Sequence, residues 1–297
     1  MPDLDFARLR EIRAHNPELV ASAAAGRRRR PLLDDGGRLM LVAADHPARG
    51  ALGVRDQAMA MADRYDLLTR ITTALSRPGV DGVLGTADIL EDLLLLGALE
   101  DKVVIASMNR GGLQGATFEL DDRFTAFTAE WIEASRYDGG KMLTRIDLAD
   151  PGTAATLESA GHAVTALAER GLVAMIEPFL SQREDGRVSN DLTSDGVIRS
   201  VSVVAGLGAT SAYTWLKVPV VDDMDRVMAA TTLPTLLLGG DPTTKPAETY
   251  ATWEKALAVA GVRGLIVGRA LLYPPDGDVA AAVDTAAGLV RAARGQP

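Results

Sequence analysis

Short apolar runs alternate with longer amphipathic or alanine-rich stretches along the chain from about residue 38 onward. Short, mostly apolar runs bounded by turn residues indicate buried strands, whereas apolar positions that recur every three to four residues indicate helices. By these criteria the chain contains eight strand candidates, separated by stretches of helical character. They are RLMLVAADHP, DGVLGT, KVVIASMNR, GKMLTRID, LVAMIEPF, AYTWLKVPV, PTLLLGGD and RGLIVGR.

The stretches between the strands predict helices, and several begin after Asp, Thr or Pro, as helices commonly do. The clearest cover residues 87–100, 123–136, 153–169 and 247–261. Eight strand–helix repeats predict a single (β/α)8 TIM barrel, an α/β fold, over residues 38–297. Residues 1–37 are expected to form an N-terminal helical extension, with one extra helix within residues 1–30.

A doubly wound parallel sheet is the alternative α/β fold for this pattern. Such a sheet usually carries a glycine-rich turn after its first strand. Here the first strand ends in AADHPARG, with no GxGxxG motif. The barrel is therefore the better prediction.

Composition narrows the class of protein. The chain is 47% hydrophobic and 24% charged, carries a net charge of -9 and has no cysteine, so no disulfide framework, thiolate metal site or thiol nucleophile is available. The N-terminal segment lacks an apolar signal core, and no apolar run approaches the roughly 20 residues that span a bilayer. We expect a cytoplasmic protein with neither a nucleic-acid partner nor a membrane partner.

Four consecutive arginines at residues 27–30 stand out against this acidic background. Short charge clusters usually lie on solvated surfaces. We interpret the cluster as a solvated cap or an interface patch, with an anion-binding role as the alternative.

Polar residues at the carboxyl ends of barrel strands are the natural candidates for chemistry. Asp45 ends the first strand, Lys141 lies in the fourth, Glu177 ends the fifth and Lys217 lies in the sixth. Burying these groups costs free energy unless they are paired, and pKa values shift where they converge. The structural alternatives are that Asp45 only caps the following segment and that Lys141 and Glu177 form an ion pair that fills the barrel.

Lys217 interrupts the apolar run SAYTWLKVPVV at residues 211–221, in a chain with 26 arginines and only five lysines. A lysine between apolar walls and other cations loses its proton more readily. The free amine can attack a carbonyl and form a Schiff base, which an arginine cannot do. The position therefore predicts a nucleophile, with a nearby carboxylate to move protons.

The ends of the last two strands predict a phosphate site. Small residues there let backbone N–H groups approach an anion, and an arginine adds a bidentate partner. The candidates are Gly239, Gly240, Gly268 and Arg269. The alternative is that these glycines only make tight turns. Arg110 and Arg145, at the third and fourth strand ends, are further candidates for an anion, unless they simply lie on loops.

No metal or other cofactor is expected. The chain has three histidines, of which only His46 lies at a strand end, so the usual imidazole cluster is missing. The lysines predicted in the same mouth would also repel a cation.

Taken in order, these motifs resemble those of the class I, Schiff-base aldolase superfamily. It includes the tagatose-1,6-bisphosphate, sulfofructose-phosphate, deoxyribose-phosphate and archaeal-type fructose-bisphosphate aldolases. The tagatose-bisphosphate branch is the most similar. Its strands carry an Asp, a Lys, a Glu before Pro, a Schiff-base Lys near Pro and two phosphate-binding ends. Their counterparts here are Asp45, GGKMLTRID, MIEPF, LKVPVV, LLLGGD and IVGRALLY, and the resemblance covers most of residues 38–275.

Two positions depart from that branch. Val218 follows the predicted Schiff-base lysine where the branch often has Glu, and His46 stands where Gln is expected. The chain is also similar to an actinobacterial group of (β/α)8 aldolase-like proteins linked to inositol breakdown. That resemblance implies 2-deoxy-5-keto-gluconate 6-phosphate as one possible substrate.

The resemblance implies an aldehyde-lyase that cleaves a phosphorylated sugar or sugar acid, and we expect a homo-oligomer. Lys217 would attack the carbonyl, and Glu177 or Asp45 would move protons. Lys141 would hold a substrate oxygen and depress the pKa of Lys217. Two alternatives remain open: a non-catalytic sugar-phosphate sensor on an aldolase scaffold, and a different TIM-barrel lyase or epimerase.

Overall fold

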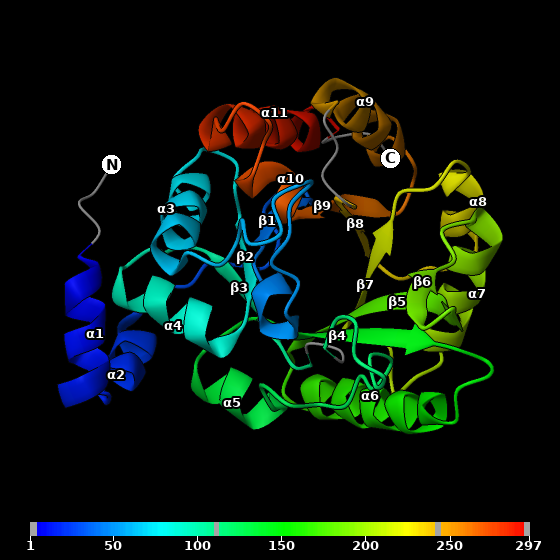
Figure 1. Cartoon of the computed structure of the whole chain (residues 1–297), viewed down its shortest axis with the longest axis horizontal. Coiled ribbons are helices and arrows are strands. Elements are labelled where there is room, and N and C mark those ends of the chain that lie inside the picture. Colours follow the sequence, from blue (N-terminus) through cyan, green and yellow to red (C-terminus); the bar gives the residue numbers. More distant parts are fainter. Residues whose placement is uncertain (1–4, 110–112, 241–244, 294–297) are drawn as a thin grey trace.

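A computed structural model describes residues 5–109, 113–240 and 245–293, and it shows a ring of parallel strands enclosed by helices (Figure 1). The strands are β1 Leu39–Ala43, β2 Gly82–Gly85, β3 Val103–Ser107, β4 Gly139–Ile146, β5 Val173–Glu184, β6 Arg187–Asn190, β7 Thr214–Pro219, β8 Thr235–Leu238 and β9 Val262–Val267. The helices are α1 Phe6–His15, α2 Leu19–Gly26, the 3₁₀-helix η1 His46–Arg49, α3 Arg64–Leu75, α4 Ala87–Leu95, α5 Ala129–Ala134, α6 Gly152–Ala168, α7 Ser194–Val204, α8 Met224–Ala229, α9 Pro246–Leu257, α10 Arg269–Leu272 and α11 Val279–Ala292. Among these residues no helix has the length and apolarity needed to cross a membrane.

The strand order confirms the predicted (β/α)8 barrel. The parallel order is β4-β3-β2-β1-β9-β8-β7-β5, and β4 pairs with β5 to close the ring. All eight predicted strands belong to it. The ninth strand, β6, was not predicted: it pairs antiparallel with the outer end of β5. Asp185 and Gly186 both have positive φ at the turn, which is the usual Asp-Gly hairpin signal.

Alternation along the strands sends successive side chains to opposite faces. One buried cluster, which includes Leu41, Ile105, Met175 and Trp215, fills the barrel interior. The other face of each strand packs against the surrounding helices. Because Lys217 lies two residues beyond Trp215, it shares the inward face, one layer closer to the carboxyl ends of the strands.

The N-terminal extension contains two helices rather than the single helix predicted. Helix α1 ends before Asn16, whose backbone has left the helical region at φ -140° and ψ 53°. Pro17 explains the break, because a proline disfavours helical geometry in the residue before it. Both helices lie outside the ring beside α4 (Figure 1).

The arginine cluster is not merely a solvated cap. The side chain of Arg27 is buried and donates hydrogen bonds to backbone carbonyls, including that of Lys102 at 2.8 Å. The next three arginines pair with aspartates that precede barrel strands: Arg28 with Asp101, Arg29 with Asp138 and Arg30 with Asp81. The cluster therefore ties the extension to the amino-terminal end of the barrel, opposite the site described below.

The helix predicted over residues 123–136 is shorter in the structure. Helix α5 begins only after Thr128, whose hydroxyl caps it by accepting from the Trp131 backbone N–H. Residues 123–127, which precede it, have no regular secondary structure. Asp122, buried directly before these residues, pairs with Arg145 of β4, so a long-range ion pair competes with local helix propensity.

Candidate active site

The carboxyl ends of the barrel strands surround a cavity of about 560 Å³. Strands β1, β4, β5 and β7 direct Asp45, Lys141, Glu177 and Lys217 into it. Each of the four residues is at least nine-tenths buried. The structure thus brings together the four residues that the sequence marked for catalysis.

These side chains form one continuous chain of ion pairs. The Lys217 ammonium lies 2.9 Å from Oε1 of Glu177, and the other carboxylate oxygen of Glu177 pairs with Lys141. Lys141 also donates to Oδ2 of Asp45 at 3.0 Å. Two positive and two negative groups therefore offset one another, which a buried cluster of charges requires.

The two lysines are not equivalent, because Lys141 contacts two carboxylates and Lys217 contacts one. For Lys217, burial lowers the pKa, and neighbouring Lys141 lowers it further, against the opposing charges of Glu177 and Asp45. For Lys141, burial also favours the neutral form, but Asp45 and Glu177 together outweigh it and raise the pKa. Lys217 is therefore the lysine that gives up its proton more readily.

Both carboxylates are held in the ionised form. Burial alone would raise their pKa values, but Lys141 and Lys217 outweigh it and lower the pKa of both Asp45 and Glu177. At neutral pH each can accept a proton. Glu177 contacts both ammonium groups, so it can receive a proton from either.

The predicted phosphate residues line the same cavity. An ideal Cβ at Gly239 would lie 2.4 Å from Cγ1 of Val267, so a larger residue would clash there. Gly240 has φ +66°, a backbone conformation that favours glycine. Gly268 caps α10, which begins at Arg269. The guanidinium of Arg269 donates to the carbonyl oxygen of Gly53 at 3.3 Å. These four residues lie together at one side of the mouth, and their phosphate-binding role stays a prediction.

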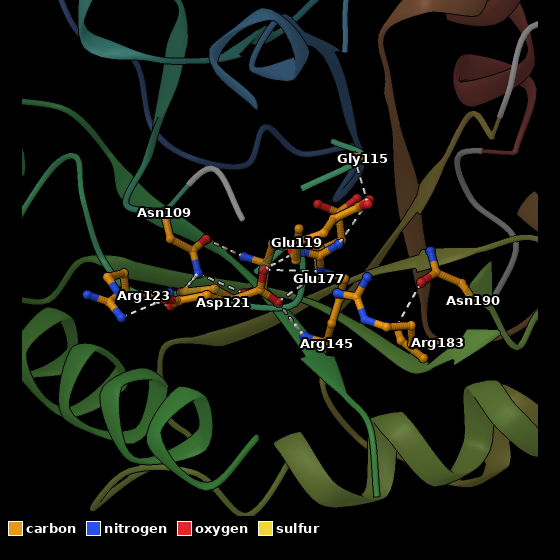
Figure 2. A network of polar contacts seen from close by, with 12 residues as sticks. Asn109, Gly115, Glu119, Asp121, Arg123, Arg145, Glu177, Arg183 and Asn190 are labelled. Carbon is orange, nitrogen blue, oxygen red and sulfur yellow. Dashed lines mark hydrogen bonds and ion pairs between the residues drawn. The ribbon is translucent and has the colours of Figure 1, made fainter. Parts of the chain in front are cut away.

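Arg145 also lines the cavity, but its guanidinium is engaged by the segment after β3. It pairs with Asp122 at 2.6 Å and lies 3.9 Å from Glu119. Figure 2 shows Arg145 within this polar network, which Asn109 joins from the end of β3. The other arginine predicted for an anion, Arg110, lies outside the described residues.

Sequence reasoning missed several residues of the cavity wall. Arg49 lines it from η1, and Val188 and Asn190 reach it from β6. The signal for Arg49 was present, since it lies four residues after Asp45 in AADHPARG and the first βα connection of a barrel belongs to the active-site face. The β6 residues required recognition of the Asp-Gly hairpin.

Metal ligands are not grouped in the described part of the chain. No cluster of three or more His, Cys, Asp or Glu side chains there could hold a metal ion. Asp45 and Glu177 instead share a lysine.

Comparisons with known proteins agree with this architecture. Residues 37–287 match the model of a protein family described as Cgl0159-like. The crystal structure of Cgl0159 from Corynebacterium glutamicum is 57% identical in sequence, with a TM-score of 0.95 over 98% of each chain. No curated protein matches the chain in sequence.

More distant structures share the fold. One is an archaeal fructose-1,6-bisphosphate aldolase with its catalytic lysine bound to the carbinolamine intermediate of the substrate. It is 17% identical, with a TM-score of 0.66, covering 92% of this chain and 99% of that one. Another is a fructose-bisphosphate aldolase from Slackia heliotrinireducens DSM 20476, 17% identical with a TM-score of 0.61, covering 91% and 87%. At this identity the likeness shows a common barrel.

Proposed function

The chain belongs to the Cgl0159-like family. From the geometry of its cavity we propose that it is a class I aldolase, a carbon–carbon lyase that works through a Schiff base on Lys217. One observation carries the proposal. Two buried lysines share Glu177, yet only Lys217 has a lowered pKa. A buried lysine with a lowered pKa beside a carboxylate is the arrangement that imine chemistry needs.

The proposed reaction begins when the neutral amine of Lys217 attacks the substrate carbonyl and forms a carbinolamine. Glu177, 2.9 Å from the amine, moves the protons that let water leave as the iminium forms. A carboxylate then removes the proton of the hydroxyl on the carbon to be released. The carbon–carbon bond breaks, its electron pair forms an enamine with the iminium, and an aldehyde departs. Protonation and hydrolysis of the enamine regenerate the lysine.

In this proposal Lys141 stays charged throughout. Two carboxylates hold its proton, so it acts as a fixed cation that binds a substrate oxygen and disfavours a second ammonium beside it. The substrate is a phosphorylated sugar or sugar acid, whose phosphate binds at Arg269 and the neighbouring glycines. Within that class, 2-deoxy-5-keto-gluconate 6-phosphate is one candidate to test.

Borohydride trapping tests the proposal directly. The protein is incubated with a panel of phosphorylated ketoses, sugar acids and dihydroxyacetone phosphate, reduced, digested and examined by mass spectrometry. We expect one modified peptide, which contains Lys217. Binding without an adduct or turnover would instead indicate a sugar-phosphate sensor on an aldolase scaffold.

Chelation should leave the activity unchanged, because the proposed chemistry uses only side chains. We expect the rate of sugar-phosphate cleavage to be the same before and after dialysis against EDTA. A loss that zinc or another divalent ion restores would favour a metal-assisted lyase instead.

Replacing Arg269 with alanine should raise KM for a phosphorylated substrate by about 10- to 150-fold, because a charge-assisted contact contributes roughly 1.5–3 kcal/mol. Steady-state kinetics measure the effect. Arg263→Ala is the matched control, since Arg263 is exposed on β9, the strand that precedes α10, and does not line the cavity. An unchanged KM in the Arg269 variant would indicate that another residue binds the phosphate. Arg49 would be the next residue to test.

A further inference from the structure

His46 is a cavity residue that the proposed reaction does not yet use. It follows Asp45 directly and begins η1, and its imidazole lines the cavity. An ideal Cβ at Gly268 would lie 3.0 Å from Cε1 of His46 and 2.6 Å from the carbonyl oxygen of Ala43. The imidazole therefore packs closely against the backbone of Gly268, where the absence of a side chain leaves room for it.

The two ring nitrogens of His46 face different surroundings. Nδ1 is fully buried without a hydrogen-bond partner and lies 3.8 Å from Oδ1 of Asp45. The side chain is still 18% exposed, so its accessible part is the opposite edge of the ring, which carries Nε2. Since His46 lines the cavity, that edge faces the space a substrate would fill.

Burial, together with the neighbouring cations, favours the neutral form of the ring. Burial lowers the pKa of His46 to about 3, and Arg49, Arg269 and Lys217 add to that effect against the opposing charge of Asp45. The imidazole is therefore neutral at physiological pH and carries one proton. The adjacent carboxylate favours that proton on Nδ1, because a lone pair on Nδ1 would repel Asp45. Nε2 is left as an acceptor.

Resting on the aldolase function above, we propose that His46 is a substrate-binding residue whose Nε2 accepts a hydrogen bond from a hydroxyl of the substrate's carbonyl fragment. Asp45 fixes the tautomer by facing Nδ1, in the way that a carboxylate partner orients a histidine in other sites. The two carboxylate oxygens of Asp45 thus have different neighbours: Oδ2 accepts a hydrogen bond from Lys141, and Oδ1 faces His46. The pair would select ligands that present a hydroxyl at this wall rather than a second anion.

Two amide substitutions separate this role from a structural one. In His46→Gln the side-chain oxygen can reach the place of Nε2, whereas in His46→Asn the shorter amide reaches only the place of Nδ1. We expect His46→Gln to retain binding and His46→Asn to lose it. If His46 only orients Asp45, the order should be reversed, with Asn the better replacement.

The measurement uses two probes that differ by one hydroxyl, dihydroxyacetone phosphate and hydroxyacetone phosphate. Borohydride trapping gives the concentration of each probe at which half of Lys217 is modified. Wild type and His46→Gln should prefer the hydroxylated probe by about 2- to 13-fold, the range of one neutral hydrogen bond. His46→Asn should show no preference. An equal preference in all three proteins, or a preference retained only by the Asn variant, would overturn the assignment.

A second readout does not depend on the aldolase proposal. The chain has only three histidines, so nitrogen NMR resolves His46 by comparison with the Gln variant. We expect a neutral ring with its proton on Nδ1 from pH 5 to 8. An imidazole pKa near 6.5, or a neutral ring with its proton on Nε2, would contradict the inference. Lack of any trapped adduct in wild type would instead refute the Schiff base, and this assignment, which rests on it, would fall too.

Discussion

Lys217→Arg should abolish both turnover and the borohydride-trapped adduct while leaving the protein folded. A guanidinium keeps the positive charge that Glu177 needs at 2.9 Å, so the buried chain of ion pairs survives. It stays protonated in proteins and cannot act as an amine nucleophile. We expect cleavage of the phosphorylated substrate to fall to background. Sugar-phosphate cleavage and mass spectrometry of the reduced protein measure the two losses.

The control is Lys255→Arg, because Lys255 is exposed on α9 and should behave as wild type in both assays. Lys217→Met serves as a second variant if the larger guanidinium disturbs the fold, which thermal unfolding will reveal. An adduct that persists on Lys141 in the variants would indicate that Lys141 forms the Schiff base and that Lys217 is the fixed cation. Normal turnover in a Lys217 variant would refute the class I mechanism.

Much of this site was accessible from sequence, because two simple rules determine where the residues lie. Side chains alternate along a strand, so Lys217 shares the inward face of β7 with Trp215. Catalytic groups in a barrel lie at the carboxyl ends of its strands. Together the rules bring Asp45, Lys141, Glu177 and Lys217 into one cavity, as the structure has them.

The sequence does not predict which side chains form ion pairs with one another, because that depends on distances between strands. Nothing local indicates that Lys141 has two carboxylate partners and Lys217 one, yet that difference separates their pKa values. Arg145 illustrates the same limit. It looked available to a substrate anion, but its partner Asp122 comes from a segment 23 residues earlier in the chain. Its neighbours there were predicted as part of a helix.

The sequence-based predictions missed the β5–β6 hairpin and the burial of Arg27 for different reasons. The Asp-Gly turn that precedes β6 is a strong local signal for a hairpin, but the strand–helix repeat pattern of a barrel does not include an extra antiparallel strand. Arg27 is buried because backbone carbonyls of residues far along the chain accept its hydrogen bonds. Burial of a cation by carbonyl groups leaves no pattern in hydrophobicity.

Glu177→Gln should reduce kcat by about 10²- to 10⁴-fold, the usual contribution of an acid–base group. The amide can still accept a hydrogen bond from one lysine, but it cannot carry the proton between Lys217 and the substrate. Removing the negative charge leaves Lys141 paired with Asp45 alone and takes from Lys217 the only carboxylate partner it has among the pairs described. Because Glu177 raises the pKa of Lys217, its loss should lower that pKa further.

The variant should therefore separate two steps. With a more readily neutralised Lys217, the borohydride-trapped adduct should still form, although more slowly, while cleavage nearly stops. Glu254→Gln, exposed on α9, is the matched control and should retain both. Urea unfolding measures the structural cost, since breaking a buried ion pair typically costs about 3–5 kcal/mol. If the variant unfolds easily but its folded fraction cleaves substrate at nearly the normal rate, Glu177 is a structural partner of the lysines, and the proton must move through Asp45.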